Sequence, residues 1–190
     1  MLAKIILFIL EVASDLLAVA FLARFILQWV RASFRNPVGQ FVIALTDWAV
    51  LPLRKLVPGL FGLDMASLLL AWLVQMGYLA IAYLLTTTGL PGATMPVLPL
   101  LAASLVAVAR LAVHLAMAVV LITALLSWVN PHAPLAPFFN ALARPLLAPV
   151  QRFVPPIGGI DLSPLLLLLA LQVVLMVLDN LGVAAFGIGR

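Results

Sequence analysis

Four apolar stretches dominate the sequence, at about residues 2–30, 65–85, 100–129 and 164–186. A helix needs about 20 mostly apolar residues to cross a bilayer, and each stretch reaches that length. Within a membrane every backbone N–H and C=O must be satisfied inside the protein, so such stretches fold as helices. The sequence therefore predicts an all-α membrane protein with four transmembrane helices.

The sequence also contains an internal duplication. Uncommon residues of the connector between the first two apolar stretches recur 97 positions later, pairing Pro52 with Pro149, Lys55 with Arg152, Pro58 with Pro155, Gly62 with Gly159, and Asp64 with Asp161. Upstream of the connectors the spacing is 99, as between Trp29 and Trp128. We predict a first repeat at residues 1–88, a linker at 89–99, and a second repeat at 100–190.

The connectors at residues 32–63 and 130–162 are too short and too interrupted by charge and proline to span. We expect them to form amphipathic helices at the membrane surface, as one helix or two joined at Pro52 in the first connector. Asp64 and Asp161 directly precede apolar stretches and are predicted to cap those helices. Each repeat is then a helix, an amphipathic connector and a helix. With two spans per repeat, the repeats lie parallel.

The distribution of positive charge predicts the orientation. Lys4 and Arg190 lie at the chain ends, on the face of the membrane opposite the connectors. The connectors form a basic face that carries Arg31, Arg35, Arg54, Lys55, Arg144 and Arg152. By the positive-inside rule, the connectors are cytoplasmic and both termini are periplasmic.

Ionisable residues inside the apolar stretches are the main candidates for function. Glu11 and Asp15 share one helix face, and Arg110 and His114 occupy the corresponding positions 99 residues later. In parallel repeats, acids of one repeat would face bases of the other. We expect Glu11–Arg110 and Asp15–His114 pairs that lock the repeats together. An ion or proton pathway, with His114 titrating near neutral pH, is the alternative.

Other polar residues in the apolar stretches have simpler predicted roles. Gln75 and Gln172 are matched in the two repeats and are expected to make interhelical amide hydrogen bonds. Together with the four ionisable residues, the two glutamines form the predicted intramembrane polar cluster. Arg24 is expected to extend its side chain to the cytoplasmic surface. Asp179 has no acidic counterpart in the first repeat and is expected to be solvated at the interface.

The sequence disfavours several function classes. Only 8% of residues are charged, with no basic run that would follow a nucleic acid backbone. The chain has no cysteine, and its histidines lack neighbours at metal-ligand spacing, so no metal site or cofactor is predicted. Paired nucleophile and base, phosphate-binding glycine loop and HExxH motif are all missing. We therefore expect a protein that is not an enzyme.

The second connector contains Gly158-Gly159-Ile160-Asp161-Leu162-Ser163-Pro164 after a proline-rich run from Pro145 to Pro155. This pattern resembles the signature of the YggT family, and the first connector resembles its other copy. The resemblance covers nearly the whole chain. It implies a bacterial inner-membrane protein, with relatives linked to osmotic or ion homeostasis and to division or cytochrome assembly.

Two functional hypotheses follow from the residues and the resemblance. The first is a membrane scaffold, assembly factor or stress-tolerance factor whose connectors contact anionic lipid or a membrane-protein partner. The second is an ion channel or transporter subunit that uses the intramembrane polar cluster. Four helices are few for a pore, so the second hypothesis requires a homo-oligomer.

Overall fold

The computed structural model describes residues 1–57, 59, 62–87, 96–153 and 161–186, apart from the side chains of residues 3 and 183–186. Within these ranges the regular structure is helical. The helices are α1 (Leu2–Trp29), α2 (Pro37–Arg54), α3 (Met65–Thr87), α4 (Val97–Val129), α5 (Ala136–Gln151) and α6 (Ser163–Phe186). In the described part of the chain, α1, α3, α4 and α6 are long and apolar enough to cross a membrane. The predicted all-α fold with four transmembrane helices is confirmed.

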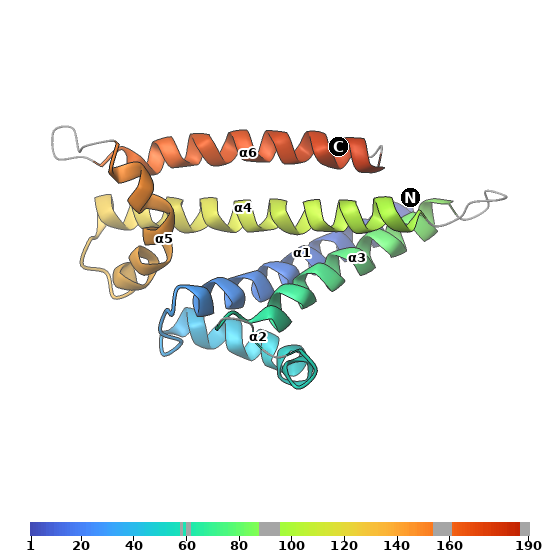
Figure 1. Cartoon of the computed structure of the whole chain (residues 1–190), viewed down its shortest axis with the longest axis horizontal. Helices are drawn as coiled ribbons and strands as arrows, with labels where there is room; N and C mark the ends of the chain where they lie inside the picture. The colour runs from blue at the N-terminus through green and yellow to red at the C-terminus, as the bar shows by residue number, and fades with distance from the viewer. Residues whose placement is uncertain (58, 60–61, 88–95, 154–160, 187–190) are drawn as a thin grey trace.

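The two repeats are built alike. Helix α1 packs along α3 with α2 against both, and α4 packs along α6 with α5 against both. Figure 1 shows α2 and α5 at the same end of the long helices, while the N-terminus and the C-terminal end of α6 lie at the other end. The connectors therefore share one side of the molecule, as expected of parallel repeats.

Helix α2 begins at a well-defined cap and runs on past Pro52 as one helix. The Asn36 side chain accepts a hydrogen bond from the Gly39 backbone N–H at 2.8 Å. A Cβ at Gly39 would lie 2.8 Å from Phe34 Cα, so only glycine fits this close approach. Pro52 falls near the end of one continuous helix, which excludes the alternative of two helices joined there.

The outer face of α2 differs from the expected polar face. Val42 and Val50 are buried toward the bundle, while a second apolar row lies exposed on the outside: Phe41, Leu45, Trp48 and Leu51. A helix that is apolar on both faces is buried in protein or lipid. Helix α2 is therefore suited to the bilayer interface.

The repeats meet in two apolar clusters. Phe21 of α1, Val50 of α2, Ala71 of α3 and Val108 of α4 belong to the same buried cluster. A second cluster at the connector end joins α1 and α2 to α5. Helix α6 packs against α4 and α5. The first repeat thus contributes both long helices to the contact with α4.

Candidate functional site

A cleft of about 1090 Å³ lies between α1, α3, α4 and α6. Residues from the N-terminal halves of α1 and α4 and the C-terminal halves of α3 and α6 line it, so it lies in the part of the bundle away from the connectors (Figure 1). Its lining includes the polar residues Glu11, Asp15, Gln75, Arg110, His114 and Asp179. Five members of the predicted polar cluster therefore surround one cavity between membrane-spanning helices.

On the first-repeat side, an amide holds an acid in place. Gln75 Nε2 donates to Asp15 Oδ1 at 2.9 Å, and Gln75 is only 2% exposed. This hydrogen bond joins α1 to α3, as predicted for an interhelical amide. Glu11 lies one turn earlier on α1 and lines the same cleft. Both carboxyl groups thus border the cavity.

On the second-repeat side, a base is held by an acid of its own repeat. Arg110 Nε lies 2.9 Å from Asp179 Oδ1, which is ion-pair distance, although the N–H of Nε is not aligned for a hydrogen bond. His114 Nδ1 lies 2.9 Å from the Arg110 carbonyl oxygen. Asp179 is 55% exposed, in line with the expected solvation, but its ion pair with Arg110 was not predicted.

Asp15 and Arg110 contact residues that were not predicted as their partners. We expected Asp15 to meet His114, but Asp15 accepts from Gln75 within its own repeat. Arg110 meets Asp179, which is also in its own repeat. The Arg110–Asp179 pair could have been predicted, because Asp179 is the only acid in the sequence of the two long helices of the second repeat.

Gln172 departs from its repeat counterpart. It is exposed on α6, whereas Gln75 is buried against α1. Gln172 does not line the cleft. Among the lining residues that the structure describes there are three acids, Glu11, Asp15 and Asp179, and one permanent cation, Arg110. The formal charge of these four side chains is negative, so their electrostatic field favours cations.

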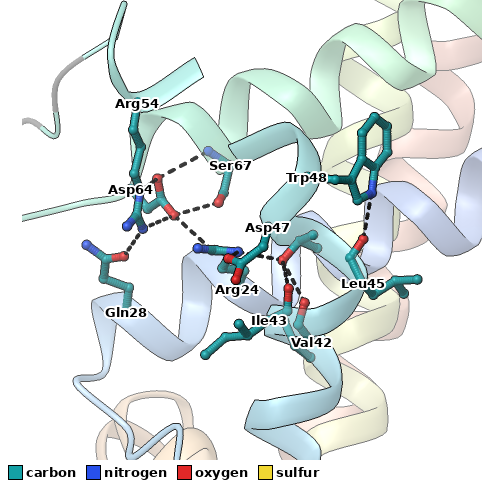
Figure 2. Close-up of polar contacts among 11 residues, drawn as sticks. Arg24, Gln28, Val42, Ile43, Leu45, Asp47, Trp48, Arg54, Asp64 and Ser67 are labelled. Atoms are coloured by element: carbon teal, nitrogen blue, oxygen red, sulfur yellow. Dashed lines mark hydrogen bonds and ion pairs between the residues drawn. The ribbon is translucent and has the colours of Figure 1, made fainter. Parts of the chain in front are cut away.

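A second polar cluster joins α1, α2 and the start of α3, and Figure 2 shows it in detail. Arg24 Nη1 donates to Thr46 Oγ1 at 2.8 Å and to Asp47 Oδ1 at 2.7 Å. Arg24 Nε lies 3.5 Å from Asp64 Oδ2. Arg24 is 5% exposed, so the expectation that it extends to the surface is wrong. Acceptors supplied by α2 and Asp64 replace water around its guanidinium group.

Asp64 is the centre of this charged network. Arg54 Nε and Nη2 donate to its two oxygens at 3.1 and 2.5 Å, and Ser67 donates from its hydroxyl at 2.6 Å and its backbone N–H at 3.4 Å. Burial alone would raise the pKa of Asp64, but the hydrogen bonds from Arg54 and Ser67 outweigh burial and hold that pKa below its ordinary value. The hydrogen bond with Asp64 raises the pKa of Arg54. Asp64 therefore caps α3 and also binds two arginines.

The second repeat carries a neutral version of this network. Gln151 corresponds to Arg54, and its Nε2 donates to Asp161 Oδ2 at 2.8 Å. Thr123 corresponds to Arg24 and donates to backbone carbonyls. Asp161 Oδ1 accepts from the Ser163 backbone N–H at 2.8 Å, at the start of α6. Burial acts to raise the pKa of Asp161, but hydrogen bonds from Ser163 and Gln151 lower it overall.

The remaining predicted residues fall into two groups. Arg54 of the predicted basic face contacts Asp64 and Gln28, so it is only partly available to lipid or a partner. The other basic residues are exposed: Arg31, Arg35, Lys55, Arg144 and Arg152. Pro52 and Pro149 lie inside α2 and α5. Gly158 and Gly159 lie outside the described residues.

The sequence matches the family described as CCB3/YggT over residues 3–85 and 102–182. An uncharacterized protein of Pseudomonas aeruginosa is 38% identical over 92% of this chain and 88% of its own length. The protein YggT of Escherichia coli K12 is 33% identical over 93% of this chain and 88% of its own length. A protein of Vibrio alginolyticus is 33% identical over 87% of this chain and 88% of its own length. No solved structure matches the chain.

Proposed function

The chain belongs to the CCB3/YggT family, and on that premise we propose that it is a non-enzymatic membrane protein that admits small monovalent cations or protons to its intramembrane cleft. The observation that supports this function is the gathering of Glu11, Asp15 and Asp179 around one cavity between membrane-spanning helices. Such a role connects the protein to ion homeostasis under osmotic stress.

The energetics of the bilayer favour a functional over a purely structural role for these acids. An ionisable group at the centre of a transmembrane helix costs about 2.5–3.5 kcal/mol on insertion scales. The ion pair with Asp179 offsets this cost for Arg110, whereas the hydrogen bond that Asp15 accepts comes from the neutral amide of Gln75. The carboxylates border a cavity large enough for water and ions. An excess of acids over bases there attracts cations.

Carbodiimide labelling tests cation binding directly. A hydrophobic carbodiimide modifies carboxyl groups inside membranes, and a cation bound at the same carboxylates blocks the reaction. We expect modification at Glu11 or Asp15, located by mass spectrometry, to slow as K⁺ or Na⁺ replaces choline at constant ionic strength. Raised pH slows this reaction at any carboxyl group, because carbodiimides react with the protonated form, so the pH is held constant throughout. Modification that is indifferent to K⁺ and Na⁺ would contradict binding of these cations in the cleft.

A second candidate function is supported by the exposed apolar row on α2. Trp48 and its neighbours Phe41, Leu45 and Leu51 face outward at the end of the molecule that also holds α5. Exposed apolar rows of this kind mark contact with lipid or another protein. A scaffold or assembly factor would use this row together with the exposed basic residues, and would carry no ion flux.

We further propose that the protein lies in the bacterial inner membrane with its connectors in the cytoplasm. Because the chain has no cysteine, single cysteines report each face separately. Arg35 is exposed after α1, and Leu98 is exposed at the start of α4, on the opposite side. In intact spheroplasts, Leu98→Cys should react with a membrane-impermeant maleimide, while Arg35→Cys should react only after lysis. The reverse pattern would overturn the orientation.

A further inference from the structure

Helices α3 and α4 make the larger helix–helix contact between the repeats, and each uses one face in it. Trp72 Nε1 of α3 donates to Ser104 Oγ of α4 at 2.8 Å. On α4, this face continues one, two and three turns further with Val108, Leu111 and Leu115, which pack in the core shared with the first repeat. On α3, helical spacing places Leu68, Gln75 and Leu79 in one row with Trp72, and this row lines the cavities that α4 also lines, while the Gln75 amide contacts Asp15 of α1. These two rows form the internal interface.

The α4 row has a counterpart on α1 that is left open. At the 99-residue spacing, Ser104 and Val108 correspond to Ile5 and Ile9. Ser104 and Val108 are 0% and 8% exposed, whereas their α1 counterparts and the two that follow are 41% to 66% exposed: Ile5, Ile9, Val12 and Leu16. The face of α4 that is buried in the bundle therefore corresponds, in the first repeat, to an exposed apolar row on α1.

The α3 row has an open counterpart on α6. At the 97-residue spacing, Trp72 corresponds to Leu169 and Gln75 to Gln172. The α6 row is exposed along its length and consists of Leu165, Leu169, Gln172 and Met176. Helix α6 packs against α4 and α5 on its other side. Each repeat therefore uses one half of the interface and presents the other half to the membrane.

We propose that a second copy of this chain fills the open halves, with the α6 row of one copy packed on the α1 row of the next. The internal interface supports this occupant, because it already joins the same two faces of one structural unit. The contact is head-to-tail rather than two-fold. Repeating a head-to-tail contact builds a ring or an open chain. Because the repeats are parallel, successive copies share one orientation in the membrane, and the assembly can close into a ring.

Gln172 favours a protein partner over lipid on this face. Its amide is exposed in the middle of α6, where lipid offers no hydrogen-bond partner. Polar side chains in membrane helices gather at helix–helix interfaces, where such hydrogen bonds stabilise association. Around it the row is apolar, and Leu169 and Ile5 take the places of the Trp72–Ser104 pair. The open halves therefore offer an apolar contact where the internal interface has a hydrogen-bonded pair.

Disulfide cross-linking between differently marked chains tests the proposal. The cysteine-free chain is expressed as Ile5→Cys in one epitope-tagged copy and Leu169→Cys in a second, in the same membranes. Oxidation should link the two tags into a dimer. The matched control replaces Leu169→Cys with Val174→Cys, which is also exposed on α6 but points away from the row. When one chain carries both cysteines, oxidation should yield a series of cross-linked multimers, and the largest should have the number of copies in the ring.

Several results would overturn the proposal. Equal linking to Val174→Cys would show random collision, and strong linking of Ile5→Cys to itself would show a two-fold interface. Linking to neither, with a single-copy mass in native mass spectrometry from lipid nanodiscs, would leave lipid or another protein on these faces. Because all substituted residues are exposed, loss of folding is not expected to obscure the result.

Discussion

Replacing Asp64 with asparagine is expected to lower the free energy of unfolding by about 3 kcal/mol. The introduced amide would keep the shape and the helix-capping acceptor but lose the negative charge. Arg24, which is 5% exposed, would then retain Asp47 as its acidic partner, and Arg54 would lose both of its bonds to a carboxylate. The buried Arg24 guanidinium would thus keep one carboxylate partner instead of two, and breaking a buried ion pair in this way is costly. Denaturant titration of the purified protein in detergent measures the change.

The duplicated sequence supplies a matched control. Asp161 occupies the equivalent position, but its partners are the neutral Gln151 side chain and the Ser163 backbone. We expect Asp161→Asn to cost about 1 kcal/mol or less, the net value of ordinary hydrogen bonds. Equal losses for the two variants would contradict the view that charge pairing with Arg24 and Arg54 sets the importance of Asp64.

Asp64→Asn and the parent protein should also differ in how acid changes their stability. The pKa of Asp64 is lower in the folded state, so its stabilising effect is fully present above its unfolded-state value of about 3.9. That effect disappears as the pH falls through the folded-state pKa. The drop in stability on acidification below about pH 4 should therefore be smaller in Asp64→Asn than in the parent protein.

The helices and the repeat could be predicted from the sequence because they depend on simple periodic properties. Apolar runs of spanning length fix α1, α3, α4 and α6, and the recurrence of Pro52 and Asp64 at a constant spacing fixes the duplication. Most of the polar residues that line the cleft could also be predicted from the sequence. Ionisable residues in spanning helices are few, and the bilayer drives them to the interior of the bundle.

The pairing of those residues could not be predicted because it depends on how far the helices slide and rotate. The repeat spacing places Asp15 opposite His114, but the packing places Gln75 nearer. The burial of Arg24 could not be predicted for the same reason. Sequence periodicity does not reveal that Thr46 and Asp47 of the connector turn toward α1. Such contacts link segments far apart in the chain.

Neutralising the two acids of α1 is expected to have the largest functional effect. In Glu11→Gln with Asp15→Asn, both side chains keep their size, and the amide oxygen introduced by Asp15→Asn can still accept from Gln75, so the fold should persist. At an effective dielectric constant of about 20, a carboxylate stabilises a cation 4 Å away by about 4 kcal/mol. Losing two such groups should reduce cation passage at least about a hundredfold. Asp161→Asn, which lies outside the cleft, is the control and should leave passage unchanged.

Cation flux into liposomes that contain only the purified protein tests the proposed function most directly. Loaded vesicles are followed with fluorescent reporters of K⁺, Na⁺ and internal pH after an imposed gradient. We predict that the parent protein and Asp161→Asn carry a flux that Glu11→Gln with Asp15→Asn loses while remaining folded. Vesicles with the parent protein that are as tight as protein-free ones, or a double variant that carries the parent flux, would contradict cation passage through the cleft and favour the scaffold.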